Sequence, residues 1–258
     1  MKKNIIVCGA LAYDRIMDFP GRFSEHILAE KTHILNLSFT VKGIKESFGG
    51  TGGNIAYNLS MLGEKPKLIA VVGKDFSKYK NWLLKNKIDI SGVKIDKHEV
   101  TAHANIITDQ DDNQITIFYP GSKIKIFPNL FIKENKNILA VIAPDIVARM
   151  VKYAKIFKRN HLPYIFDPGQ QTPYYNSTEL KYSILGSEML IGNDYEIQLI
   201  LDKLKIKLEQ LKTMVKILVN TKGGQGSEIY IKNKKIIIKA VKKKKGVDTT
   251  GAGDAYRA

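Results

Sequence analysis

The chain has 258 residues, of which 44% are hydrophobic and 26% charged, and Cys8 is its single cysteine. This composition excludes a wholly disordered, collagen-like or coiled-coil protein, and one cysteine excludes an intramolecular disulfide or a cysteine-based zinc cage. The net charge of +16 comes from 41 basic and 25 acidic residues, but only five of the basic residues are Arg and the Lys residues are scattered, so a dedicated nucleic-acid surface is not indicated.

The N-terminal segment predicts a buried strand rather than a signal peptide. Residues 5–8 form a continuous apolar run that ends at Gly9. Two Lys precede this run, but the whole unit is shorter than the roughly 15–30 residues of a signal peptide, and Asp14 follows closely. No apolar stretch reaches the ~18 residues that cross a bilayer. We therefore expect a cytoplasmic protein without a membrane or nucleic-acid partner.

From about residue 54 onward, helical and apolar strand segments alternate, which predicts an open α/β sheet with helices on both faces. In chain order, the predicted strands of this sheet are residues 5–8, 67–72, 138–142, 163–166, 189–191 and 217–220. The predicted helices are residues 54–62, 79–86, 145–159 and 195–203. No internal repeat or low-complexity linker interrupts this order, so residues 1–258 are expected to form a single domain.

Two segments depart from this alternation and predict a small accessory sheet. Residues 12–47 and 98–121 are hairpin-like and half polar, and strands 102–108 and 114–119 flank the polar turn Asp111-Asp112-Asn113. A second hairpin is predicted from residues 227–231 and 235–241. The run Lys242-Lys243-Lys244-Lys245 that follows it predicts a solvated loop.

The first of four Gly-rich segments precedes the helix predicted from residue 54. Gly49-Gly50-Thr51-Gly52-Gly53-Asn54 leaves its backbone amides exposed, so that a ligand can approach them closely. A plain tight turn before a helix is the alternative. The segment does not match the dinucleotide fingerprint G-x-G-x-x-G, and the P-loop pattern G-x-x-x-x-G-K-[ST] occurs nowhere in the sequence.

The second segment, residues 248–255, joins small residues to an acid at a predicted helix start. The amides of Gly251, Ala252 and Gly253 would point into one concavity, which suits an anion. Asp254 beside them could take a proton from an alcohol that attacks phosphorus. The alternative is that Asp254 only caps the helix.

The third and fourth segments follow later strands. Asn193 and Glu196 lie on one face of a helix start, where they could hold Mg²⁺ through waters or simply cap the helix. The loop from Thr221 through Gly223 to Gly226 could lie against a nucleotide or form a turn.

Together and in this order, these segments resemble the PfkB (ribokinase-like) family of sugar and nucleoside kinases. Residues 49–56 resemble the first signature of that family, and residues 248–256 closely resemble its second. Residues 9–14, 114–116, 119–121 and 166–170 look like the bacterial and archaeal adenosine kinase-like branch. The resemblance extends from residue 5 to the last residue.

The resemblance implies a three-layer α/β/α sandwich with a β-sheet lid, and transfer of the γ-phosphate of ATP to a primary hydroxyl of a nucleoside, adenosine first. It implies that Asp254 is the general base and that Gly251, Ala252 and Gly253 stabilise the transferred group. Substrate would be bound by Asp14, Gly49, Gly50 and Asn54. ATP would be bound by Asn193, Thr221, Gly223 and Gly226, with Glu196 at the Mg²⁺. Candidates for an apolar slot for the base are Tyr13, Ile16, Phe39 and Phe118, although plain lid packing is the favoured interpretation of each.

The resemblance also has a limit at the C-terminus. Family members continue well past the position of Ala258, so we expect the sequence as given to lack the C-terminal part of the domain, to bind ATP weakly and to turn over slowly or not at all. A ribose- or fructose-type sugar kinase and a truncated non-catalytic remnant remain alternatives. The protein would be a monomer or a homodimer.

Overall fold

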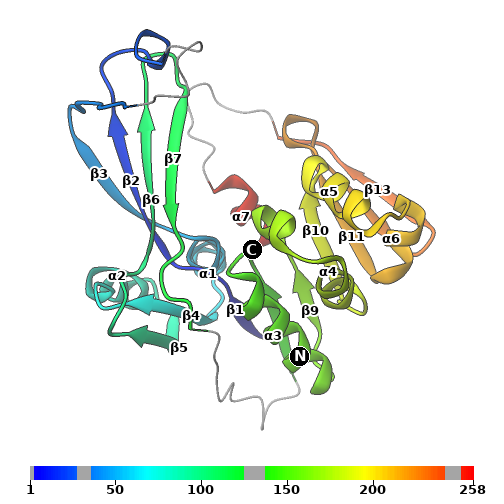
Figure 1. Cartoon of the computed structure of the whole chain (residues 1–258). Coiled ribbons are helices and arrows are strands. Elements are labelled where there is room, and N and C mark those ends of the chain that lie inside the picture. Colours follow the sequence, from blue (N-terminus) through cyan, green and yellow to red (C-terminus); the bar gives the residue numbers. More distant parts are fainter. Residues whose placement is uncertain (1–2, 28–35, 125–136, 242–250) are drawn as a thin grey trace.

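A nine-stranded sheet forms the centre of the protein. The computed structural model describes residues 3–27, 36–124, 137–241 and 251–258 (Figure 1). In spatial order the strands are β13 (Lys234–Ile238), β12 (Ser227–Ile231), β11 (Ile217–Thr221), β10 (Met189–Asn193), β9 (Tyr164–Phe166), β8 (Ile138–Ile142), β1 (Asn4–Cys8), β4 (Lys67–Gly73) and β5 (Asp89–Asp96). The strands from β5 to β11 are parallel, and β12 and β13 continue the sheet as an antiparallel hairpin.

Helices cover both faces of this sheet, and each face has its own hydrophobic core. The helices α1 (Thr51–Met61) and α2 (Ser77–Lys85) cover one face. The other face is covered by α3 (Val147–Arg159), α4 (Ser177–Ile184), α5 (Asp194–Leu204) and α6 (Leu208–Met214). Because side chains alternate along a strand, Val7 of β1 packs under α1 while its neighbours Ile6 and Cys8 pack in the opposite core. The expected three-layer architecture is therefore confirmed.

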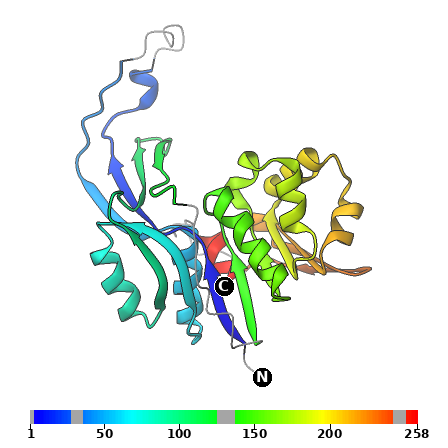
Figure 2. The ribbon, with the colours of Figure 1, turned by 60° about the horizontal axis from the view of Figure 1, so that its bottom comes forward.

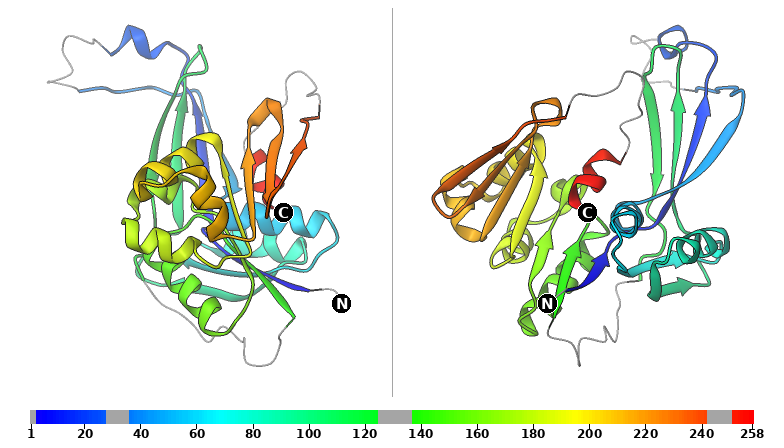
Figure 3. Two further views of the ribbon diagram at one scale, coloured as in Figure 1. Left: turned by 90° about the vertical axis from the view of Figure 1, so that its right-hand side faces the viewer. Right: turned by 180° about the vertical axis from the view of Figure 1, so that it is seen from behind.

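A second, four-stranded sheet extends away from the main sheet (Figures 1 and 3). Its spatial order is β3 (Ile44–Gly49), β2 (Ala12–Asp18), β6 (Ala102–Thr108) and β7 (Gln114–Tyr119). The strands β2 and β6 are parallel, while the β2–β3 and β6–β7 pairs are antiparallel. The accessory sheet expected from the two hairpin-like segments is thus present.

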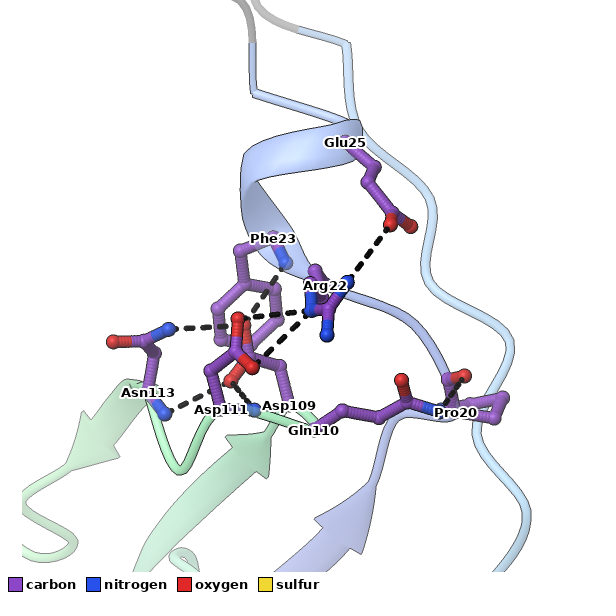
Figure 4. A network of polar contacts seen from close by, with 8 residues as sticks. All are labelled: Pro20, Arg22, Phe23, Glu25, Asp109, Gln110, Asp111 and Asn113. Atoms are coloured by element: carbon purple, nitrogen blue, oxygen red, sulfur yellow. Dashed lines mark hydrogen bonds and ion pairs between the residues drawn. The ribbon is translucent and has the colours of Figure 1, made fainter.

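The far end of the accessory sheet is held by a polar network around Asp109 (Figure 4). Asp109 is buried, and it accepts hydrogen bonds from the backbone amides of Phe23, Asp111 and Asn113 at 2.9–3.0 Å. The side-chain amide of Asn113 adds a fourth bond at 3.1 Å, and Arg22 forms an ion pair with Asp111 at 3.0 Å. These contacts join the turn between β6 and β7 to the short 3-10 helix Phe23–Glu25.

Most of the predicted elements are present, with small shifts at their ends. The hairpin of β6 and β7 matches its predicted bounds, whereas α1 begins at Thr51 and not at residue 54. The elements β5, α4 and α6 were not expected from the sequence. The run Lys242-Lys243-Lys244-Lys245 lies outside the described residues. In the part of the chain that the structure describes, no helix has both the length and the apolar character needed to cross a bilayer.

Candidate active site

Asp14 lies on β2, soon after the chain leaves the main sheet at the end of β1. The backbone of β3 passes directly behind its carboxylate, since a Cβ atom on Gly49 would lie 2.1 Å from Asp14 Oδ2. Only glycine allows this close approach. Burial raises the pKa of Asp14, and the negative charge of Asp254 raises it further. The two carboxyl groups therefore belong to one site although they are far apart in the sequence.

Asp254 lies on α7 (Ala252–Arg257), which packs beside α1 near the middle of the molecule (Figure 2). The side-chain amide of Asn54 donates a hydrogen bond of 2.8 Å to Asp254 Oδ2. Burial raises the pKa of Asp254, and the Asn54 hydrogen bond and the positive charge of Arg257 oppose this shift. The N-cap of α7 is Gly251, so Asp254 is not the N-cap residue and instead lies in the first turn of the helix.

Asp14, Gly50, Asn54 and Asp254 line one cavity of about 160 Å³. The sequence predicted these four as site residues, and Gly49 stands behind Asp14. The remaining lining residues are Ala10, Ala12, Thr51, Phe118 and Gln170. Gln170 belongs to the stretch of residues 166–170 that resembles the adenosine kinase-like branch, but no role was predicted for it.

The aromatic residues considered for an apolar slot have different positions. Phe118 of β7 lines the cavity and is half exposed. Tyr13 is buried and packs against Phe48. Phe39 packs against Phe19 at the far end of the accessory sheet. Of these three aromatic residues, only Phe118 lines this cavity; Tyr13 and Phe39 take part in packing.

A second cavity, of about 520 Å³, lies on the other side of α7. Among its lining residues are Thr221, Gly223 and Gly226, which the sequence predicted to contact a nucleotide, and Ala252 and Gly253 of α7. The others are Gly224, Ser227, Ile238, Lys239, Ala240, Val241 and Tyr256. Because Asp254 lines the small cavity while Gly253 lines the large one, the start of α7 separates the two.

Asn193 and Glu196 form a capping box at the start of α5. The Glu196 amide donates to Asn193 Oδ1, and the Asn193 amide donates to Glu196 Oε2, both at 2.8 Å. The capping geometry that the sequence allowed is thus present. Neither residue lines the two cavities just described.

Asp167 and Arg257 also lie in this region, although no role was predicted for either residue from the sequence. Arg257 of α7 forms an ion pair with Asp167, which directly follows β9, and also contacts Glu196 Oε2 at 3.5 Å. Burial raises the pKa of Asp167 to about 7, although the charge of Arg257 opposes this shift. The available signal was the position of Asp167 directly after a buried strand, because ligands of parallel α/β sheets bind at that edge.

The sequence of the chain is similar to a family model and to known kinases. Residues 6–258 match the model of the pfkB family of carbohydrate kinases. The chain is 35% identical over 225 residues to a nucleoside kinase of Methanocaldococcus jannaschii, which covers 86% of this chain and 74% of that protein. It is 28% identical over 267 residues to a ribokinase of Bacillus subtilis, which covers 99% of this chain and 84% of that protein.

Solved structures of other proteins also have a fold similar to that of this chain. The nucleoside kinase of Burkholderia thailandensis in complex with inosine superposes with a TM-score of 0.84 at 35% identity, covering 98% of this chain and 81% of that one. The nucleoside kinase of M. jannaschii superposes with a TM-score of 0.87 at 32% identity, covering 99% and 82%.

Proposed function

Because the chain belongs to the pfkB family of carbohydrate kinases, we propose that it transfers the γ-phosphate of ATP to a primary hydroxyl of a nucleoside, with adenosine as the first candidate. The position of α7 between two cavities is the observation that supports this proposal most directly. A phosphate donor in the larger cavity and an alcohol in the smaller one would meet at the start of α7, beside Asp254.

The small cavity suits the ribose of a nucleoside. A carboxylate such as Asp14 accepts hydrogen bonds through two oxygens, which fits the vicinal hydroxyls of the sugar. Gly49 brings the backbone of β3 close to this carboxylate, and Gly50 lines the same cavity. The ring of Phe118 offers an apolar face to the base. Since Phe118 lies on β7, the accessory sheet would act as a lid whose closure excludes water from the reaction.

The larger cavity suits ATP. Thr221, Gly223 and Gly226, which line this cavity, would contact the nucleotide. Asn193 does not line it and would lie towards the phosphates from the start of α5. The backbone amides from Gly251 to Gly253 would bind the transferred phosphoryl group, where preorganised donors stabilise developing charge. Ser227 Oγ and the Tyr256 hydroxyl, 2.6 Å apart, join the wall of this cavity to α7.

Asp254 would act as the general base. As the hydroxyl oxygen forms its bond to the γ-phosphorus, the bond from that phosphorus to the bridging oxygen of ADP breaks, and the hydroxyl proton moves to the carboxylate of Asp254. The hydrogen bond from Asn54 fixes the orientation of this carboxylate. The product side then holds a nucleoside monophosphate and ADP.

Mg²⁺ is the metal that this family chemistry implies, and it would neutralise charge on the phosphates of ATP. The described residues contain no group of three His, Cys, Asp or Glu side chains placed to hold a metal. Mg²⁺ usually keeps several waters and binds mainly through phosphate oxygens and one or two carboxylates, so a single protein carboxylate is compatible with it. Glu196 is the carboxylate that would hold it.

A panel of adenosine, inosine, ribose and fructose, each with and without Mg-ATP, tests this proposal. We expect nucleosides to raise the melting temperature by mass action, and labelled ATP to yield labelled nucleoside monophosphate. The binding readout does not require rapid turnover. If only ribose or fructose raises the melting temperature of the protein and becomes labelled, a sugar kinase is favoured. Nucleoside binding without any transfer would favour the non-catalytic alternative, and the absence of both would refute the proposed function.

A further inference from the structure

Arg257 joins three acidic side chains that come from separate elements. Its guanidinium is paired with Asp167 at the end of β9, with a second contact from Nη2 to Asp167 Oδ1 at 3.2 Å. The same Nη2 atom lies 3.5 Å from Glu196 Oε2 at the start of α5. Asp254 is three residues earlier on the same helix and interacts electrostatically with Arg257. The cation thus lies where β9, α5 and α7 meet.

The cluster is nearly closed to solvent. The side chains of Arg257, Asp167 and Glu196 are only 9%, 1% and 14% exposed. Ion pairs on an exposed surface contribute little to folding stability, because water competes with them. Removing one partner of a buried ion pair is strongly destabilising, because the other charge is left buried without compensation. The fork of donors on Arg can bind two carboxylates at once, which the ammonium group of Lys cannot do in the same geometry.

The guanidinium also lies against the glycine turn at the start of α7. A Cβ atom on Gly253 would lie 2.6 Å from Arg257 Nη1, so the side chain folds back along its own helix. Glu196 in turn forms the capping box with Asn193. One side chain therefore links the segment that holds Asp254 to the start of α5.

We propose that Arg257 is a positioning residue, which sets the placement of Asp254 and Gly253 relative to Glu196 for phosphoryl transfer. This inference rests on the proposed function, because it concerns the geometry of that same reaction. The competing explanation is that Arg257 only neutralises the buried carboxylate of Asp167. The two explanations differ in what happens when both members of the pair become neutral.

The test compares Arg257→Gln, Asp167→Asn and the double variant. The single change Arg257→Gln leaves Asp167 buried without its cation, and we expect a lower melting temperature together with lower turnover. In the double variant the pair has no uncompensated charge, so the melting temperature should recover. If Arg257 positions the site, kcat stays about 10- to 100-fold below that of the parent, while KM for the nucleoside changes less than threefold.

The variant Arg257→Lys adds a second measurement that does not depend on the double variant. It keeps the charge but not the fork, so we expect a kcat about tenfold lower with a melting temperature close to that of the parent. Arg159→Gln, an exposed change at the end of α3, is the matched control and should alter neither value.

The outcomes separate the two proposals. A double variant, or Arg257→Lys, with kcat within threefold of the parent would overturn the positioning role and leave the proposed function intact. A parent protein that transfers no phosphate to any nucleoside or sugar would refute the proposed function and this inference with it. A lasting loss of kcat with unchanged nucleoside KM supports the inference.

Discussion

The substitution Asp254→Asn tests the centre of the proposed mechanism. The amide has nearly the same size as the carboxylate, and its oxygen can still accept the 2.8 Å hydrogen bond from Asn54. The fold and the small cavity should therefore remain. The change removes the proposed proton acceptor. A general base contributes roughly 10²–10⁴-fold to the rate, or about 3–5 kcal/mol of the activation barrier.

The same substitution should preserve nucleoside binding and extend it to lower pH. Burial raises the pKa of Asp14, and the negative charge of Asp254 raises it further. A neutral amide at position 254 removes the second cause. The pKa of Asp14 should then fall, so that Asp14 stays ionised and able to accept two hydroxyl hydrogen bonds at a lower pH than in the parent.

The assay combines transfer from labelled ATP with titration of adenosine by calorimetry over a range of pH. Because burial raises the pKa of Asp254 above its ordinary value, kcat/KM of the parent should fall as the pH falls through that raised pKa. The variant should lack the part of this fall that comes from Asp254 and keep only the fall at lower pH that comes from Asp14. Asp202→Asn, an exposed change on α5, is the control. A variant at position 254 that retains more than a tenth of the parental kcat would show that Asp254 is not the base.

Three further changes test the pocket and the fold around it. Asp14→Asn should weaken nucleoside binding by roughly 10- to 150-fold, which corresponds to about 1.5–3 kcal/mol for a charged hydrogen bond. An unchanged Kd in calorimetry would show that Asp14 does not bind the nucleoside. Gly53→Ala would place a Cβ atom 2.0 Å from the hydroxyl of the buried Tyr79, so denaturant unfolding should show a loss of about 1–3 kcal/mol in the free energy of unfolding. Gly43→Ala is the control and should show no such loss, because Gly43 has open space around it. Asp109→Asn should weaken the hydrogen bonds at the far end of the accessory sheet and speed hydrogen exchange there, and exchange equal to that of the parent would mean that these bonds do not hold the hairpin.

The elements that the sequence predicted well are those with a strong local pattern. The strands β6 and β7 alternate on either side of a polar turn, and β8 is a continuous apolar run. The strand β5 was missed because it is half exposed and contains Gly92, which weakens a strand pattern. The helix α1 begins inside the Gly-rich segment, where helix propensity is low, because Gly52 and Gly53 pack against the neighbouring backbone and side chains.

The site was predictable only in part for a similar reason. Each Gly-rich segment alone allowed both a structural and a functional role, and the contacts that bear on this choice differ between segments. Asn193 and Glu196 do form a capping box, whereas Asp254 accepts its hydrogen bond from Asn54, 200 residues away in the chain. The pairing of Arg257 with Asp167 joins residues 90 positions apart, and no local pattern connects them.

The placement of α7 explains why small residues precede Asp254 in the sequence. The helix lies between a pocket that contains Asp14 and a cavity bounded by the Gly223–Gly226 loop, so under the proposed function its first turn would approach ligands on both sides. A side chain at Gly253 would displace Arg257, and one at Gly251 would strain a residue with φ of 77°. The acid at position 254 can then face one cavity while the backbone amides face the other. In the proposed mechanism the base and the anion site lie on opposite sides of one helical turn, so the alcohol and the phosphate donor can meet there without either ligand moving past the other.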